Sequence, residues 1–328
     1  EDVCNVYNGG LYGPGGIVAL LERFKPEYLL IAGGFHRDCR AQQPDHAADP
    51  AWQPGIPAGL IHLEQLTVND DLYSLKNTVK VSRVPLRAKE EFTAWAAKAV
   101  RYTPPDNLIL FAGENKKVDF SNYQRQYIGN LPSATLEADG VAQETVRKKL
   151  FGLMNTGATL VLYQGHAQSW ELDKGLLKGQ NAKDMPESCW VLATCNAAYY
   201  HGDFEVYVRD WMAAPAGGCV NALASSSVGA DDQQDMVIRR FIEHLKKAPD
   251  EDWGGMMRFL KRNLPLAESV MNDPNAPKFI TANLDKDRMT IDAYSCLGDP
   301  AAKIFAKTPR KAAFTLETGD EKRQIYAP

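Results

Sequence analysis

The sequence predicts an α/β protein with a mostly parallel sheet covered by helices on both faces. Short apolar runs of strand length alternate along the chain with segments of helical periodicity. The apolar runs are nearly continuous, as in strands that are buried on both faces. Strands separated by helices favour parallel pairing, because a helical crossover returns the chain to the same edge of the sheet. The length of 328 residues suggests about two units.

The first series of elements precedes residue 103. A helix at 17–24 carries Ile17, Leu20, Leu21 and Phe24 on one face, and Pro26 ends it. The apolar run at 28–32 predicts a buried strand that closes at a Gly-Gly pair. The remaining elements are a loop rich in Pro, Asp, Gln and Ala at 36–58, a strand at 77–81 and a helix at 89–102 with an apolar stripe of 3.6-residue period.

The two adjacent prolines in Thr103–Asn107 mark the best internal boundary, because they cannot continue a helix. A second α/β series begins there. Its predicted strands are 108–112, 158–163, 190–194 and 217–224, and its predicted helices are 144–154, 205–212 and 233–247. The chain changes character after Pro300, where 313–316 suggests a lone strand. We therefore expect units at 1–104 and 105–309, followed by a tail or the start of a β-rich module at 310–328.

Composition excludes several classes of protein. Hydrophobic residues make up 45 % of the chain and charged residues 24 %, which excludes disorder as a description of the whole. The 37 Lys and Arg against 41 Asp and Glu give a net charge of -4, so there is no general electrostatic case for nucleic acid. No apolar run reaches the roughly 18 residues of a membrane span. The chain starts at Glu1, so the sequence gives no information on a secretion signal.

The six cysteines are too few for a disulfide scaffold, and none stands at zinc-ligand spacing. A free nucleophile among them would leave an odd number, so not all could pair within the chain. Composition alone leaves the compartment open. The six are Cys4, Cys39, Cys189, Cys195, Cys219 and Cys296.

Three predicted strands of the second series end in chemically useful residues. Glu114 follows strand 108–112, His166 follows strand 158–163, and Cys195 follows strand 190–194. Sites in parallel α/β sheets form beyond the carboxyl ends of the strands. If these strands are neighbours, a carboxylate, an imidazole and a thiol meet on one rim, which is the set that nucleophilic thiol catalysis needs.

Each residue also has an ordinary structural explanation. A buried cysteine such as Cys189 or Cys219 is usually a small hydrophobic residue, and a histidine at a strand end is often structural. Glu114 alone would be a loop carboxylate or a helix cap. Cys195 differs from the other thiols because it lies just past a strand end. The three residues together favour catalysis more than any one does alone, and the residues by themselves leave both interpretations open.

Longer motifs around these residues resemble the gingipain (C25-type) cysteine peptidase family. Residues 157–170, which read GATLVLYQGHAQSW, resemble its strand-plus-His motif, and LATCN at 192–196 resembles its Cys segment. Residues 214–227 resemble the next strand with its Ser-rich end, and Leu297–Pro300 resembles the motif that closes the catalytic unit. Segments 70–73 and 80–86 resemble the N-terminal subdomain. The resemblance covers the chain up to about residue 309.

The resemblance implies a caspase-like three-layer α/β/α sandwich of two adjacent subdomains, of which the second is catalytic. Cys195 falls on the family's nucleophile, His166 on its general base and acid, and Glu114 on the acid that supports the histidine. The oxyanion would be held by the backbone N–H groups of Cys195 and Ala167. The family usually has Gly-His-Gly where this chain has Gly-His-Ala, so a positive φ at Ala167 would cost energy and alter the oxyanion hole.

The resemblance also indicates where a substrate would bind. Asp119 lies where family members that cleave after Arg or Lys place an acid, since a buried cation must be paired. Trp170 would wall the same pocket, and Ser225 and Ser226 would contact an extended peptide. The structural alternatives are a helix cap for Asp119, a core aromatic for Trp170 and turn residues for the serines. We therefore expect a polypeptide substrate and a basic P1 residue.

Thiol chemistry requires no cofactor. The resemblance allows structural calcium, with Asp70, Asp71 or Asp299 as candidate ligands, and it implies secretion or display on the cell surface. Two other functions stay open at this point. One is a non-catalytic module that binds a peptide or a partner protein, and the other is an acyl transferase that passes the thioester to an amine. The sequence gives no oligomeric state.

Overall fold

The computed structural model of the chain describes most of its two α/β series. The described residues are 14–34, 56, 58–62, 66–115, 118–168, 171–172, 175–178, 184–200, 206–229, 231–262, 290–306, 315–318 and 321–324. The expected loop at 36–58 lies outside them except for residues 56 and 58.

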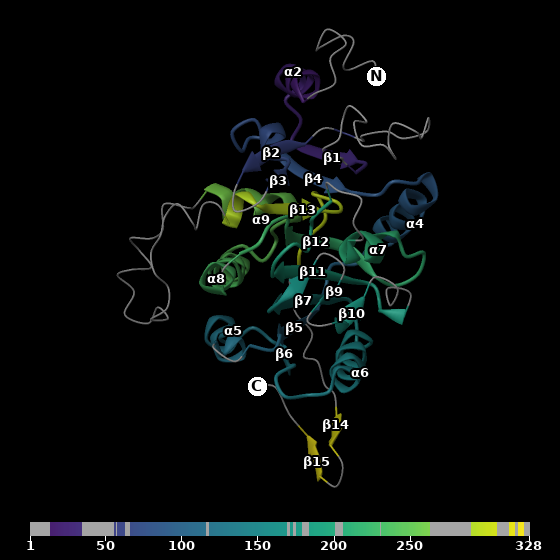
Figure 1. Cartoon of the computed structure of the whole chain (residues 1–328), viewed down its shortest axis with the longest axis vertical. Coiled ribbons are helices and arrows are strands. Elements are labelled where there is room, and N and C mark those ends of the chain that lie inside the picture. The colour runs from purple at the N-terminus through teal and green to yellow at the C-terminus, as the bar shows by residue number, and fades with distance from the viewer. Residues whose placement is uncertain are drawn as a thin grey trace, which may run out of the picture.

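One large, mostly parallel sheet organises the molecule, as the sequence predicts (Figure 1). Its eight strands have the order β1-β4-β13-β12-β11-β7-β5-β6. The pairing of β12 with β13 is antiparallel, and every other neighbouring pair in this sheet is parallel. The strands are β1 (Tyr28–Ala32), β4 (Lys80–Val84), β5 (Asn107–Ala112), β6 (Ala134–Glu137), β7 (Thr159–Gln164), β11 (Ser188–Ala193), β12 (Cys219–Ser225) and β13 (Tyr294–Leu297).

Helices cover both faces of this sheet and form a three-layer arrangement (Figure 1). Residues of α4, α6 and α7 pack into one core with the sheet, and residues of α5, α8 and α9 pack into the core on the opposite face. The helices are α2 (Gly15–Phe24), α4 (Lys89–Val100), α5 (Phe120–Ile128), α6 (Gln143–Met154), α7 (Tyr207–Ala213), α8 (Asp231–Lys247) and α9 (Trp253–Arg262).

The central strands are buried along their whole length. Every residue of β5, β7, β11 and β12 is buried, which explains their continuous apolar sequence. Side chains of β5 and β7 alternate between the two cores, so Phe111 and Tyr163 meet on one face at a ring distance of 5.0 Å. The strands that precede the candidate catalytic residues are therefore fully buried within the sheet.

The sheet is continuous across the two predicted units. The strands β1 and β4 precede residue 103, and β4 pairs with β13 from the end of the second unit through Arg83 and Leu297. Helix α4 also precedes the predicted boundary but packs on the second unit, where Trp95 Nε1 donates to the Val220 carbonyl at 2.9 Å. The boundaries at 104 and 309 stay predictions.

The predicted strand at 77–81 is wrong in its position, because the observed strand is β4 at Lys80–Val84. The sequence obscured it because buried charged residues occupy it: Lys80 and Arg83 are 7 % and 0 % exposed. Lys80 Nζ donates to Asp252 Oδ2 at 2.8 Å, and Arg83 pairs with Asp70. Ion pairing inside the protein thus gives a strand that appears polar in sequence.

Smaller elements surround the main sheet. The predicted strand at 313–316 is found two residues later, as one strand of a hairpin. These elements are β2 (Gly59–His62), β3 (Leu66–Asn69), the 3₁₀ helix η1 (Asp71–Ser74), β8 (Ala167–Gln168), β9 (Glu171–Leu172), β10 (Leu177–Lys178), β14 (Thr315–Thr318) and β15 (Glu321–Gln324).

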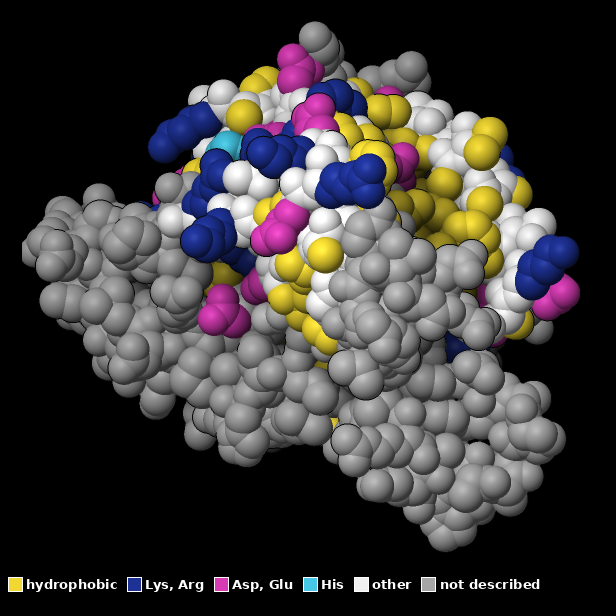
Figure 2. All heavy atoms as spheres, turned by 90° about the horizontal axis from the view of Figure 1, so that it is seen from above, with side chains coloured by type: hydrophobic (Ala, Val, Ile, Leu, Met, Phe, Trp, Pro, Cys, Tyr) yellow, Lys and Arg dark blue, Asp and Glu magenta, His cyan; other side chains and the backbone are white. Residues whose placement is uncertain are grey.

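Charged side chains of both signs share the face that is seen from above, and apolar side chains line a hollow beside residues that are not described (Figure 2). Within the described part of the chain, no helix has the length and apolar character that a membrane span needs.

Candidate functional site

The candidate catalytic residues follow three neighbouring strands at the same level. Ala112, Gln164 and Ala193 are paired across β5, β7 and β11. Glu114, His166 and Cys195 each lie two residues beyond these positions. The ladder continues for one residue, because Gly113 N donates to Gln164 O at 2.8 Å and Gly165 N donates to Ala193 O at 3.3 Å. Since neighbouring strands lie about 4.8 Å apart, the three residues leave the sheet side by side.

Glycine is required just before His166. A Cβ atom at Gly165 would lie 2.5 Å from Tyr163 Oη and 3.0 Å from Gly113 Cα. That space lets the Tyr163 hydroxyl donate to the His166 carbonyl at 2.8 Å. The side chain of His166 is exposed and Glu114 is half-buried. The backbone of the histidine is therefore held while its ring faces solvent.

Cys195 differs from the other described cysteines in its exposure. Cys189, Cys195, Cys219 and Cys296 are free thiols, and among these four only Cys195 is not buried. Burial raises the pKa of the Cys189 thiol to about 12, and it also raises the pKa values of Cys219 and Cys296. These three thiols behave as core residues, whereas Cys195 lies at the rim. Cys4 and Cys39 lie outside the described residues.

The chain turns sharply after Cys195. Asn196 has a φ of 53°, in the left-handed region that asparagine tolerates better than most residues. Its N–H donates to Ser227 O at 2.9 Å, and Ala198 N donates to Ser225 O at 2.8 Å. These bonds attach the loop to the end of β12.

The sulfur of Cys195 contacts the segment that leads into α8. The thiol donates to Gly229 O at 3.5 Å, and Gly229 N donates to the sulfur at 3.4 Å. Gln234 Nε2 lies 3.7 Å from the same sulfur and donates to Gly229 O at 3.2 Å. The sequence predicted no role for Gly229 or Gln234. They approach Cys195 only in the folded chain, across 34 and 39 positions of the sequence, and no sequence motif indicates either contact.

The two residues predicted to form the oxyanion hole both lie at this rim. Ala167 begins β8, where it pairs with Leu172, and its φ is not positive. The expected strain of an alanine at this turn is therefore absent. The role of the Ala167 and Cys195 N–H groups stays a prediction.

Ser225 and Ser226 are buried and hydrogen-bonded within the protein. Ser225 Oγ donates to Ser227 O at 3.0 Å. Ser226 Oγ donates to Val68 O at 2.5 Å and lies 3.0 Å from Ala293 O. Ser226 N also donates to Ala293 O at 2.8 Å. These contacts join β12 to neighbouring segments and support the Cys195 loop. Contact of the serines with a peptide stays a prediction.

Asp119 caps helix α5 and lies at the edge of a hollow. Its Oδ1 accepts hydrogen bonds from Asn122 N and Ser121 Oγ, and the bond from Asn122 lowers the pKa of the carboxyl group. The hollow, with a volume of about 410 Å³, lies beyond the ends of β5 and β6 and is also lined by Gly113 and Glu137. Asp119 is exposed, so its carboxylate can both cap the helix and face a ligand. Trp170 lies outside the described residues.

A buried carboxylate lies directly below the rim. Asp235 in α8 accepts from Tyr127 Oη at 2.5 Å and from Gln164 Nε2 at 3.2 Å. Burial raises the pKa of Asp235 to about 6, although both hydrogen bonds act in the opposite direction. Gln164 is the last residue of β7, so this network supports the strand that carries His166.

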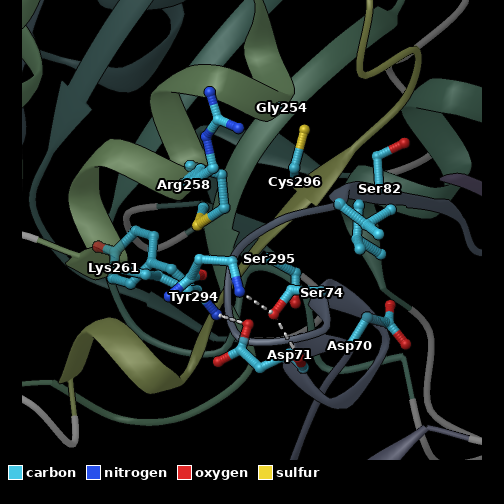
Figure 3. Close-up of a pocket in the computed structure, with 14 residues that line it drawn as sticks. Asp70, Asp71, Ser74, Ser82, Gly254, Arg258, Lys261, Tyr294, Ser295 and Cys296 are labelled. Atoms are coloured by element: carbon cyan, nitrogen blue, oxygen red, sulfur yellow. Dashed lines mark hydrogen bonds and ion pairs between the residues drawn. The ribbon is translucent and has the colours of Figure 1, made fainter. Parts of the chain in front are cut away.

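Two of the three candidate calcium ligands, Asp70 and Asp71, pair with cations of the protein itself. A pocket between η1, β4, β13 and α9 includes Asp70 and Asp71 (Figure 3). Asp71 forms an ion pair with Lys261, and both carboxylate oxygens of Asp70 accept from Arg83. Asp299 Oδ1 accepts from Ala301 N. Among the described residues, no cluster of three or more His, Cys, Asp or Glu side chains could hold a metal ion. Structural calcium stays a prediction.

The chain is similar in sequence to one peptidase family and in structure to several solved peptidases. The sequence model of peptidase family C25 matches residues 1–305. The crystal structure of the Arg-specific cysteine proteinase gingipain R superposes with a TM-score of 0.61 at 16 % identity, over 88 % of this chain and 68 % of that chain. The complex of the pro- and mature domains of RgpB from Porphyromonas gingivalis gives a TM-score of 0.59 at 14 % identity, over 87 % and 69 %. A structure described only as a protease gives 0.60 at 12 %, over 96 % and 70 %.

At these identities, the structural likeness shows the fold alone, which confirms the expected caspase-like α/β architecture. No curated protein sequence matches the chain at a significant level. The match to the family model covers most of the chain, so the chain belongs to peptidase family C25 and is a cysteine peptidase.

Proposed function

We propose that this peptidase cleaves peptide bonds through the Cys195 thiolate, with His166 as general base and acid and Glu114 as the group that orients the imidazole. The observation that carries the proposal is the matched register: all three residues lie two positions beyond paired residues of adjacent strands. Family membership supports thiol chemistry, and Cys195 is the one described cysteine that is not buried.

The proposed reaction proceeds in two stages. The thiolate attacks the carbonyl carbon of the scissile bond, and the resulting oxyanion is stabilised by the Cys195 and Ala167 N–H groups. Collapse breaks the C–N bond, and the imidazolium of His166 gives its proton to the leaving amine. Water, deprotonated by the same imidazole, then hydrolyses the thioester and releases the thiolate. Glu114 stabilises the imidazolium in both stages.

We further propose a preference for Arg or Lys at P1, with Asp119 as the partner of the substrate cation. The hydrogen bond from Asn122 lowers the pKa of Asp119, so its carboxylate is ionised at neutral pH. The hollow beside it adjoins Gly113, the residue before Glu114. A protein of the same fold is described as Arg-specific, which agrees with an acidic pocket. Secretion or surface display is proposed from family membership alone.

The test is hydrolysis of a positional-scanning peptide library by the full chain and by Cys195→Ala. We expect activity to fall roughly 10⁴-fold or more in that variant, since thiol attack is lost. Cys189→Ala is the matched control, because it removes a buried thiol from β11, the strand that Cys195 follows, and should retain activity. Unchanged hydrolysis in Cys195→Ala would contradict the proposal.

The same assay separates the finer proposals. Asp119→Asn should reduce kcat/KM for Arg and Lys substrates by about 10-fold or more while changing cleavage of uncharged P1 residues much less. An equal effect on all substrates would contradict the P1 assignment. An added amine that becomes the main acyl acceptor would instead show acyl transfer.

A further inference from the structure

The Cys195 sulfur has a neutral partner whose position no catalytic role yet explains. The side chain of Gln234 in the first turn of α8 is 2 % exposed, and its amide lies between the sulfur and the Gly229 carbonyl. The carbonyl can only accept a hydrogen bond, so the amide nitrogen must face it. The same NH₂ group therefore also faces the sulfur, which fixes the orientation of the amide.

The oxygen of this amide indicates that burial of the Gln234 side chain lowers the stability of the protein. Gln234 Oε1 is buried and has no hydrogen-bond partner among the described residues. A buried oxygen without a hydrogen-bond partner lowers stability, so an apolar side chain of similar size would be expected here on stability grounds alone. A gain elsewhere, at the sulfur, would account for an amide in this position.

The hydrogen bonds of the sulfur favour its ionised form. A neutral thiol donates to Gly229 O at 3.5 Å, and the thiolate loses that bond. It keeps two N–H groups directed at it, Gly229 N at 3.4 Å and Gln234 Nε2 at 3.7 Å. Hydrogen bonds to the charged form lower the pKa of a group, and those to a charged acceptor are stronger than those to a neutral one.

Several charged and titratable groups belong to the elements that surround the sulfur. Asp231 and Asp232 lie in the first turn of α8, where Asp231 Oδ2 accepts from Asn115 Nδ2 at 3.0 Å and Asp232 Oδ1 accepts from Gln233 N at 3.0 Å. His166 at the end of β7 favours it when protonated, and Glu114 at the end of β5 opposes it. Two tyrosines also interact with Cys195: Tyr207 of α7 and Tyr294 of β13 are buried with raised pKa values and remain neutral.

We propose that Gln234 is a positioning residue for Cys195: its side-chain amide, together with the Gly229 N–H, holds the sulfur at the rim and stabilises the thiolate. The inference rests on the proposed role of Cys195 as nucleophile. Gln234 acts through the sulfur and not on the substrate.

The test measures the pH dependence of alkylation of Cys195 by iodoacetamide in the full chain, with the modified residue located by mass spectrometry. Gln234→Met keeps the size of the side chain but removes the donor. We expect the midpoint of the alkylation profile to move upward by about one pH unit and the rate below the midpoint to fall about 10-fold. A change in packing alone would alter the rate without moving the midpoint.

Gln233→Met is the matched control. The Gln233 side chain accepts from Thr290 Oγ1 at 2.5 Å, away from the sulfur, so its midpoint should match that of the wild type. Gln234→Asn provides a second variant if Gln234→Met does not fold, because its shorter amide stays polar but is withdrawn from the sulfur. An unchanged midpoint in a folded Gln234 variant, or an equal shift in Gln233→Met, would overturn the inference.

The alkylation assay needs no peptidase activity, so the two proposals fail separately. If the midpoint shifts but hydrolysis does not depend on Cys195, the proposed function is contradicted and the inference about Gln234 stands. If the midpoint does not shift but hydrolysis depends on Cys195, the inference about Gln234 is contradicted and the proposed function stands.

Discussion

Two parts of the same sheet edge differ in how they are filled. Buried side chains occupy the carboxyl ends of β1 and β4, which we call the closed end. The residues that follow β5, β7 and β11 include exposed and half-buried side chains, and we call this part the open end. At the closed end, the Arg83 guanidinium is fully buried. It forms two hydrogen bonds with Asp70, at 2.8 and 2.7 Å, and donates to Gly33 O at 2.8 Å. At the open end, His166 is exposed and Cys195 is half-buried. Binding and catalytic sites form at the carboxyl ends of parallel strands, but only where buried side chains do not already occupy that edge of the sheet.

The closed end also supports the open one. Tyr200, five residues after Cys195, places its ring 5.3 Å from the Arg83 guanidinium, and its hydroxyl donates to Asp70 Oδ2 at 3.3 Å. The loop that follows Cys195 therefore reaches the ion pair of the closed end. The first predicted unit thus anchors a loop of the second.

The largest expected effect tests the closed end. Arg83→Met leaves Asp70 buried without its cation, and we expect a loss of about 3–5 kcal/mol in the free energy of unfolding. Arg125→Met is the matched control, since its pair with Glu137 is half-exposed and should contribute less than about 1 kcal/mol. Urea unfolding measures both. Equal losses in the two variants would contradict the contrast between the closed end and the surface.

The next effect tests the open end. Gly165→Ala places a Cβ 2.5 Å from Tyr163 Oη, so the variant must displace the segment before His166. We expect a loss of about 1–3 kcal/mol in stability and a fall of at least roughly tenfold in kcat/KM. Gly152→Ala meets no atom within 4 Å in α6 and should be neutral or slightly stabilising. Full activity in Gly165→Ala would show that the rim is not held as described.

A smaller effect is expected at Asp235, the carboxyl group below the open end, whose partners are a hydroxyl and an amide. Its pKa is about 6 in the folded protein, against an ordinary value of 3.8. Folding therefore favours its protonated form, and its contribution is most favourable below about pH 4. The unfolded chain ionises first as pH rises, so stability is lost up to about pH 6, by on the order of 3 kcal/mol.

Asp235→Asn removes this pH dependence. Relative to wild type, the variant should gain stability between pH 4 and pH 6, as measured by urea unfolding at each pH. A difference between the two proteins that does not vary with pH, or that moves in favour of the wild type, would contradict the assignment.

The smallest expected effect concerns Ala167. Because its φ is not positive, Ala167→Gly relieves no strain. We expect kcat/KM to stay within about twofold of the wild-type value. A large gain in activity would indicate that the alanine impairs the proposed oxyanion hole.

The candidate triad was predictable because each member follows a continuous apolar strand. The common register of those strands was not, since it depends on pairing between segments far apart in the chain. Strand β6 alternates between buried and exposed residues over only four positions, and sequence analysis missed it. Helix α9 and strand β13 were missed as well.

The position of Gln234 could not be predicted from the sequence. A glutamine in a helix usually lies on the solvent face, and only the tertiary structure places this one against a sulfur. Arg83 is a similar case, because its charge makes a buried strand look polar.

The most direct test of the central claim is covalent labelling by a thiol-reactive peptide probe with Arg at P1, followed by identification of the modified residue. The account predicts a single modified site at Cys195, with labelling slowed at least about 100-fold in His166→Ala while the fold is retained. Labelling at another cysteine, or labelling of Cys195 that does not depend on His166, would contradict it.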